Sequence, residues 1–208
     1  MTTISLTLVL AITILGNGCL GEHIEPVAPA QNNNKSEKHV LIAKTFSYPI
    51  GKKEYYTQAK DKDEWYNALE FGENAHLGED WNKNTGGDSD CGEPVYAIAD
   101  GFITYARDAG QGWGNVLIIE HTLPSGAKVE SLYGHMQEIL VKEGEVKKRQ
   151  QIGKIGNANG RYPCHLHFEI RTTDCPAWNQ PGPGYSNDRK GWVDPSDFID
   201  SRSRPSPQ

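Results

Sequence analysis

Short β-type runs separated by turn residues follow one another along the chain from residue 94 to residue 171. The stretch "PVYAIADGFITYARD" holds two runs divided by Asp100-Gly101, a dipeptide that favours a hairpin. "NVLIIEH" and "AKVESLYGHM" form another pair across "TLPSG", and "EILVKEGEVKKRQQIGKIG" is typical of short strands broken at glycines. The sequence contains no long amphipathic helix and no internal repeat. It therefore predicts a mainly β fold, a single domain built on antiparallel β-sheet.

The N-terminal 19 residues differ from the rest of the chain. An uncharged apolar run extends from Ile4 to Leu15 and is followed by small residues and Cys19, which is typical of an export signal. The run is too short to span a bilayer core of about 30 Å, which needs about 20 apolar residues. We expect a lipoprotein signal over residues 1–19, with Cys19 as the lipidation site. An ordinary signal with an incidental cysteine is the alternative, because no Lys or Arg precedes the run and Leu15 stands four residues before Cys19, where three is usual.

Three further segments complete the predicted organisation. Residues 20–45 are rich in Pro, Asn, Glu and Lys and are expected to form a flexible tether. Residues 46–200 form the folded domain, in which we expect a short helix around Glu64 to Glu70. Residues 201–208 are expected to be a disordered tail. Together with the signal, this order predicts an exported protein of the cell envelope, anchored by lipid, in the outer membrane if the cell has one.

Charge narrows the possible partners. The 208 residues carry a formal net charge of −6, with a pI near 5.6. Binding of nucleic acid generally needs a basic surface that displaces counterions from phosphates. We therefore expect no nucleic-acid partner, and we expect a monomer.

The spacing of the cysteines limits which of them can form a disulfide. Export would place Cys91, Cys164 and Cys175 in an oxidising compartment. If residues 164–171 are extended they cover about 23 Å, and the four residues after them return at most about 14 Å. The remaining gap exceeds the roughly 7 Å that a disulfide tolerates, so the sequence favours a bridge from Cys91 to one of the other two cysteines.

The stretch "HLHFEIR" places polar and apolar side chains on alternate faces of a predicted strand. Leu166, Phe168 and Ile170 point to one face, which we assign to the core, and His165 and His167 share the other. The two histidines stand about 7 Å apart at the backbone, close enough to address one ion or one substrate. An exposed polar face is the alternative interpretation of the same pattern.

Two other segments carry groups that can join them. In "HLGED" His76 stands four residues before Asp80, which lets both side chains converge on a helical turn or in a loop bent at Gly78. In "LYGHM" His135 follows a predicted strand. A catalytic zinc usually has three protein ligands, which His76, Asp80 and one histidine of the pair would supply. The other histidine and His135 would then be free to hold or move protons.

The motifs "HLGEDW", "SLYGHM" and "HLHFEI" occur in this order among "CGEPVYAIADGFITYA", "GWGNVLIIEH" and "WVDPSDFI". In this order they resemble the lysostaphin-type, or LytM-domain, zinc metallopeptidases that cut peptidoglycan peptides, over about residues 46–199. The resemblance implies a fold of the lysostaphin type with long loops around a metal-containing groove. It implies that Zn²⁺ is held by His76, Asp80 and His167, and that His135 and His165 are catalytic. Cys164 departs from the family pattern, where a small residue or proline is more frequent, and a bridge from it could brace the site or narrow the groove.

Three functions remain open at this point. The first is a zinc endopeptidase that hydrolyses peptidoglycan cross-links, the second a non-catalytic module of the same fold that binds the cell wall or activates a hydrolase, and the third a zinc hydrolase of free proteins. Glu169 lies on the same strand face as the two histidines and is the alternative metal ligand. Otherwise it supports a ligand or pairs with Arg171. Trp81, Trp113 and Tyr133 either line a substrate groove or pack in the core.

Overall fold

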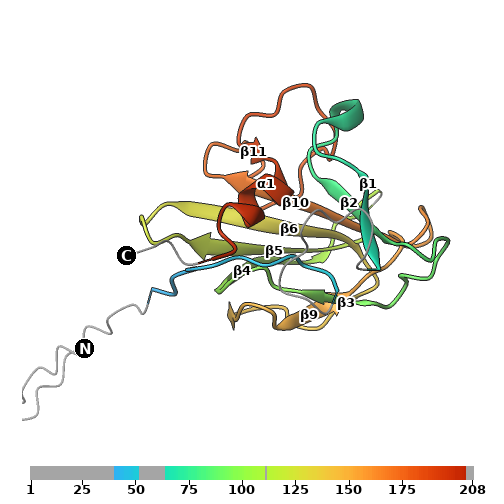
Figure 1. Cartoon of the computed structure of the whole chain (residues 1–208), viewed down its shortest axis with the longest axis horizontal. Helices are drawn as coiled ribbons and strands as arrows, with labels where there is room; N and C mark the ends of the chain where they lie inside the picture. The colour runs from blue at the N-terminus through green and yellow to red at the C-terminus, as the bar shows by residue number, and fades with distance from the viewer. Residues whose placement is uncertain (1–39, 52–63, 111, 205–208) are drawn as a thin grey trace, which may run out of the picture. The chain divides into compact units, whose positions relative to one another are not determined.

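Antiparallel strands make up most of the regular secondary structure of the computed structural model, which describes residues 40–51, 64–110 and 112–204 (Figure 1). In these ranges the larger sheet has eight strands, in the order β1-β2-β10-β6-β5-β4-β8 with β11 paired to β10. Their bounds are β1 Trp65–Leu69, β2 Glu79–Lys83, β10 Leu166–Thr172, β6 Lys128–Met136, β5 Asn115–Thr122, β4 Gly101–Asp108, β8 Glu145–Val146 and β11 Trp192–Val193. A smaller sheet has the order β3-β9-β7, with β3 Pro94–Tyr96, β9 Gln151–Lys154 and β7 Glu138–Ile139. The mainly β, antiparallel fold is therefore as predicted.

Helices are few and short in the described residues. A 3₁₀ turn, η1, covers Glu73–Ala75, and α1 covers Pro195–Asp200 with Asp194 as its N-cap. None of the described helices has the length and apolar character needed to cross a membrane.

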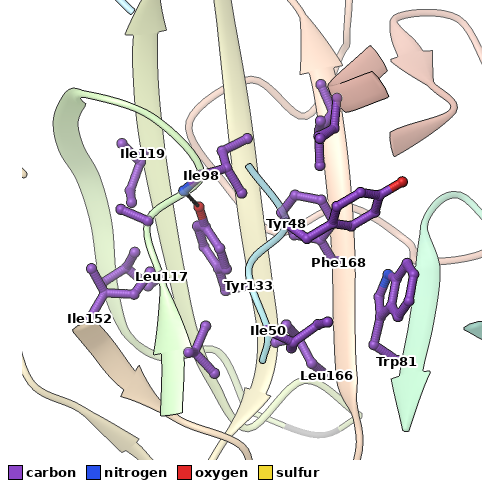
Figure 2. Packing of buried hydrophobic residues seen from close by; sticks show 14 of the residues in the cluster. Tyr48, Ile50, Trp81, Ile98, Leu117, Ile119, Tyr133, Ile152, Leu166 and Phe168 are labelled. Carbon is purple, nitrogen blue, oxygen red and sulfur yellow. Dashed lines mark hydrogen bonds between the residues drawn. The ribbon is translucent and has the colours of Figure 1, made fainter. Parts of the chain in front are cut away.

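The main hydrophobic core joins side chains of both sheets. Leu166, Phe168 and Ile170 of β10 are fully buried in it, as the alternation predicted. They share the cluster with residues of β5 and β6 and with Val95 of β3 and Ile152 of β9 (Figure 2). Burying each large apolar side chain contributes about 1.5–3 kcal/mol relative to exposure, so this cluster fixes which face of β10 points inward.

The predicted hairpin at Asp100-Gly101 is wrong. Strand β3 pairs with β9, whereas β4 pairs with β5 and β8. Residues 97–99 between them are fully buried, so the chain crosses from one sheet to the other instead of turning back. Gly101 serves close packing, since a Cβ there would lie 2.5 Å from the Glu120 carbonyl oxygen. The pair across "TLPSG" is confirmed, because β5 and β6 are adjacent and antiparallel.

The predicted helix around Glu64 to Glu70 is also wrong. Residues 65–69 form strand β1, which pairs with β2. Trp65 is buried in the main core, and the partner strand β2 offers backbone groups that a helix could not use. Tertiary pairing therefore overrides the local preference.

Both predicted boundaries of the domain shift outward. Leu41 and Ala43 are buried, and Ala43 N donates to Thr122 O at 2.8 Å. At the other end, Arg202 O accepts from Phe46 N at 3.1 Å, so residues 201–204 are held by the domain and are not a free tail. The predicted signal, Cys19, most of the tether and residues 205–208 lie outside the described residues, and they stay predictions.

One disulfide links Cys91 and Cys164, whose Cα atoms are 5.3 Å apart. This confirms a bridge from Cys91 and leaves Cys175 as a free, buried thiol. The bridge ties the loop between β2 and β3 to the residue immediately before the histidine pair.

His121 of β5 is fully buried. Its Nδ1 lies 2.9 Å from Asp100 O and its Nε2 2.8 Å from Ser131 Oγ. Burial lowers the pKa of His121 from 6.5 to about 4, although the Asp100 contacts oppose this shift. The ring is therefore neutral at pH 7, and its enclosure makes the His121–Ser131 pair a structural contact with no access for a substrate.

This depressed pKa predicts a loss of stability in acid. As the pH falls, His121 takes up a proton more readily in the unfolded chain than in the folded protein. The contribution of neutral His121 to the free energy of unfolding is therefore complete above about pH 6.5 and is lost as the pH falls toward 4. The loss is on the order of 3 kcal/mol. We expect the denaturation free energy of His121→Gln to decline much less over this range. Urea denaturation of the wild type and the variant at pH 7 and pH 4.5 measures the decline in unfolding free energy of each protein. The contribution of the other titrating groups is common to both proteins and cancels when the two declines are subtracted. Equal declines would contradict the assignment.

Candidate functional site

Three adjacent strands bring the predicted site residues together. His167 on β10 pairs with Asp80 on β2 at one side and with Gly134 on β6 at the other. Gly134 directly precedes His135, so this register places Asp80, His167 and His135 in neighbouring strands. His76 arrives from the segment that follows η1. Gly78 lets this segment lie against β10, since a Cβ there would stand 2.4 Å from Phe168 O.

His76, Asp80 and His167 form a compact donor set. His76 Nε2 lies 2.9 Å from His167 Nδ1, and Asp80 Oδ1 lies 3.0 Å from His167 Nδ1 and 3.3 Å from His76 Nε2. Donors bound tetrahedrally to zinc at about 2.0–2.2 Å stand about 3.4 Å from one another. Two imidazoles and a carboxylate with this spacing therefore fit a zinc ion, and only a small outward shift separates the described positions from such a site.

Glu169 is not a member of this set, because it contacts the opposite nitrogen of His167. Its Oε1 lies 3.0 Å from His167 Nε2, and its Oε2 accepts from Trp192 Nε1 at 2.8 Å. A proton on Nε2 donated to Glu169 leaves the lone pair of Nδ1 directed at His76 and Asp80. Glu169 thus has the position of a carboxylate that orients a ligand histidine.

The electrostatics of the cluster favour a cation. Burial disfavours a charged His167 ring, yet the hydrogen bonds that the ring donates to the Asp80 and Glu169 carboxylates outweigh burial and raise the pKa of His167 to about 9. Burial likewise opposes the charged form of Asp80, but His167 and His76 hold the pKa of Asp80 well below its usual range. Two carboxylates that stabilise positive charge on an imidazole would also stabilise a divalent cation at the same place.

His135 and His165 stand together beside the donor set. Their ring centroids are 4.7 Å apart, and the His135 ring lies 5.6 Å from that of His167. Burial, together with the neighbouring His167 and His165, lowers the pKa of His135 from 6.5 to about 3, so His135 is neutral at pH 7. His135 Nδ1 lies 3.1 Å from Trp113 O and His165 Nδ1 lies 2.9 Å from Pro163 O. His165 Nε2 lies 3.8 Å from Asp80 Oδ1, beyond hydrogen-bond distance, and both Nε2 atoms are placed to face a substrate.

A cavity of about 440 Å³ opens at this cluster. Four of the five predicted site residues line it, and the fifth, His76, is buried beneath. The lining residues are Asp80, Gly112, Trp113, His135, Tyr162, Pro163, His165, His167, Pro183, Gly184 and Tyr185. The side chains of Asp80 and His165 keep 15% and 14% exposure, so the described loops leave the reactive groups accessible.

Aromatic side chains form the walls of this cavity. Trp113 lines it, whereas Trp81 and Tyr133 are fully buried in the core. No sequence pattern pointed to Tyr162 and Tyr185, whose rings lie 5.1 Å from the His135 ring and 5.0 Å from the His76 ring, respectively. Both come from loops, where side-chain direction follows no period that a sequence pattern could reveal.

The loop of residues 173–191 covers the polar face of β10 beyond His167. Arg171 is fully buried there, paired with Glu130 at 2.8 Å and donating to Gln180 O at 2.9 Å. Asn179 N donates to Glu130 Oε2 at 2.9 Å. This face of β10 is therefore not an exposed polar surface, because the loop buries it and uses the charged side chains as its anchor.

A pocket that holds two imidazoles and a carboxylate at ligand spacing, with two more histidines at its wall, has the groups that metal-dependent hydrolases use. The profile of peptidase family M23 matches residues 75–179, which include all five of these residues. The chain belongs to peptidase family M23.

Known relatives match part of the chain. Outer membrane antigenic lipoprotein B of Histophilus somni is 44% identical over 81 residues, which are 38% of this chain and 23% of that protein. DD-carboxypeptidase/endopeptidase Mpg of Neisseria meningitidis serogroup B (strain MC58) is 38% identical over 98 residues, 46% of this chain and 22% of Mpg. Murein hydrolase activator NlpD of Salmonella typhimurium is 38% identical over 100 residues, 48% of this chain and 25% of NlpD. The matched region spans a quarter or less of each relative.

Solved structures give looser matches. The solution structure of lysostaphin superposes with a TM-score of 0.45 and 26% identity, covering 64% of this chain and 46% of lysostaphin. A zinc-containing peptidase from Vibrio cholerae superposes with a TM-score of 0.44 and 27% identity, covering 70% of this chain and 41% of that chain. At these scores the superposition does not relate individual side chains.

Proposed function

We propose that this protein is a zinc-dependent endopeptidase that hydrolyses peptide cross-links of bacterial peptidoglycan. The observation that carries the proposal is the completeness of the site: four of the five residues implied by the family resemblance line one accessible cavity, and the fifth, His76, is buried in contact with Asp80 and His167. The relative Mpg is named an endopeptidase, which supports the same activity.

In the proposed mechanism His76, Asp80 and His167 hold the ion, with Glu169 keeping His167 Nδ1 turned toward it. A bound zinc supplies a Lewis acid and an activated water. His135 and His165, with Nδ1 facing a carbonyl oxygen in each case, offer Nε2 to accept a proton or to hydrogen-bond the oxygen that gains charge. Trp113, Tyr162 and Tyr185 would hold the peptide between them and keep bulk water from the scissile bond.

A second candidate is a non-catalytic module that activates another hydrolase of the wall. The similarity to NlpD, named a murein hydrolase activator, supports it. We favour the enzyme because a module that only binds a partner has no need of a full donor set and two free histidines beside an open cavity.

We further propose that the protein is exported and anchored through lipidated Cys19 at the cell envelope. The apolar run before Cys19 and the relatives named as lipoproteins support this. The anchor would hold the cavity within reach of the wall.

Digestion of purified peptidoglycan tests the proposed activity. We expect the zinc-loaded protein to lower the turbidity of sacculi and to release cross-link fragments that mass spectrometry identifies. The matched His165→Ala variant and protein stripped with a chelator should release none. Stoichiometric zinc with no release from several wall chemistries would reject the enzyme and favour the activator, which a mixing assay with a wall amidase would then reveal.

A further inference from the structure

His165 is held differently from His167 and Asp80. Strand β10 begins at Leu166, so His165 stands just outside the paired strands and is joined to Gly156 by an isolated bridge. His167 and Asp80 lie inside the sheet, since His167 pairs with β2 and β6, and Asp80 pairs with β1 and β10. The ladders of these four strands fix His167 and Asp80, and His76 is bridged to Tyr185, away from Cys164, whereas the position of His165 depends on the Gly156 bridge and on residue 164 beside it.

Those neighbours are fastened through Cys164. Besides the disulfide to Cys91, Cys164 N donates to Asp88 Oδ1 at 2.9 Å and Cys164 O accepts from Asn82 Nδ2 at 3.1 Å. Asn82 belongs to β2, the strand that carries Asp80, and Asp88 belongs to the loop that carries Cys91. The disulfide is the covalent member of a set of contacts that holds residue 164 against this loop.

The contacts of His165 itself are weaker. His165 N donates to Gly156 O at 3.2 Å, and its ring contacts Pro163 O, a loop carbonyl next to Cys164. If residue 164 moves, the ring and its carbonyl partner move together. A displacement of about 1 Å from the reactive geometry can lower a rate by about a hundredfold.

We infer that the Cys91–Cys164 disulfide is a positioning element for His165, so that its reduction lowers the rate of the proposed hydrolysis while the donor set keeps its metal. The inference rests on the proposed function. It makes the activity dependent on the redox state of the compartment, and it assigns a role to a cysteine at which this chain departs from its family.

Chemical access to the bond is through Cys91, which is exposed, whereas Cys164 is buried. A phosphine attacks Cys91 Sγ, the S–S bond breaks, and Cys164 leaves as a thiolate that takes up a proton. Water then releases the phosphine as its oxide and returns Cys91 as a thiol, so two thiols form as one phosphine is oxidised. Cys175 is buried and outside the bridge, which makes it the matched control.

The test compares the zinc-loaded full-length protein before and after reduction with tris(carboxyethyl)phosphine, beside Cys91→Ser/Cys164→Ala and Cys175→Ser. At a temperature where circular dichroism shows all of them folded, we expect kcat to fall about ten- to a hundredfold on reduction and in the double variant. The KM, the zinc content and the Cys175→Ser variant should be unchanged, and reoxidation should restore kcat. A reduced protein with unaltered kcat, or one that loses its zinc, would overturn the inference.

A second readout separates this inference from the proposed function. If the oxidised protein cleaves no wall material, the proposed function fails, and the ring ¹H–¹⁵N signals of the labelled histidines still report on position. We expect reduction to shift the His165 signals while those of His76 and His167 stay in place. Unmoved His165 signals would reject the positioning role whatever the activity.

Discussion

A His167→Ala variant is expected to lose its zinc and, with it, all measurable hydrolysis. His167 Nδ1 lies 2.9 Å from His76 Nε2 and 3.0 Å from Asp80 Oδ1, so its removal leaves two donors where a catalytic zinc usually has three. His76→Ala and Asp80→Ala should behave in the same way. Plasma mass spectrometry of dialysed protein gives the zinc content, and circular dichroism verifies the fold.

Glu169→Gln is the matched control for this loss. The amide can still contact His167 Nε2 but no longer holds the negative charge, so we expect zinc to be retained with an affinity lower by about 10- to 100-fold. Stoichiometric zinc in dialysed His167→Ala would show that the donor set is wrongly assigned, whatever the activity of that variant.

The second large effect is expected at the two histidines outside the donor set. His135→Ala and His165→Ala should keep one zinc per chain and lower kcat by about 10²- to 10⁴-fold, the range found when a positioned acid, base or oxyanion donor is removed. The reason is geometric, because each ring has Nδ1 at a backbone carbonyl and offers Nε2 to the cavity. Steady-state kinetics on a defined cross-linked peptide measures the loss.

His121→Gln controls for the loss of any histidine, since His121 is buried in the core away from the cavity and should keep full activity at pH 7. Loss of zinc in His135→Ala or His165→Ala would move that residue into the donor set. If both variants keep the wild-type kcat, His135 and His165 have no part in the mechanism. The non-catalytic activator module would then be the better proposal.

Local patterns predicted those features that depend on neighbours in the chain. The alternation in "HLHFEIR" assigned Leu166, Phe168 and Ile170 to the core because side chains of a strand point to opposite faces whatever its partners. The chain-length argument excluded a Cys164–Cys175 bridge for a similar reason, since the reach of four residues is limited by covalent geometry. Candidate chemistry followed from residue types, because imidazole and carboxylate suit zinc wherever they meet.

Only the tertiary structure decided which segments meet. Asp100-Gly101 carries a strong hairpin signal, yet the flanking strands pair elsewhere because burying residues 97–99 between two sheets outweighs the turn preference. Residues 65–69 became a strand because β2 offered an edge to pair with, and residues 40–45 joined the domain through contacts with Thr122. Three other features likewise depend on segments distant in sequence. They are the burial of Arg171 under the 173–191 loop, the lining of the cavity by Tyr162 and Tyr185, and the disulfide that joins Cys164 to the 84–93 loop. The sequence by itself thus determined the type of fold, the facing of β10 and the chemistry available. The register of β2 against β10 brought Asp80 to His167, and the packing of the segment around Gly78 on β10 brought His76 to them, so that the donor atoms of the three residues lie within 3.3 Å of one another. Pairing partners are selected by the free energy of the whole packed core, which no short window of sequence contains.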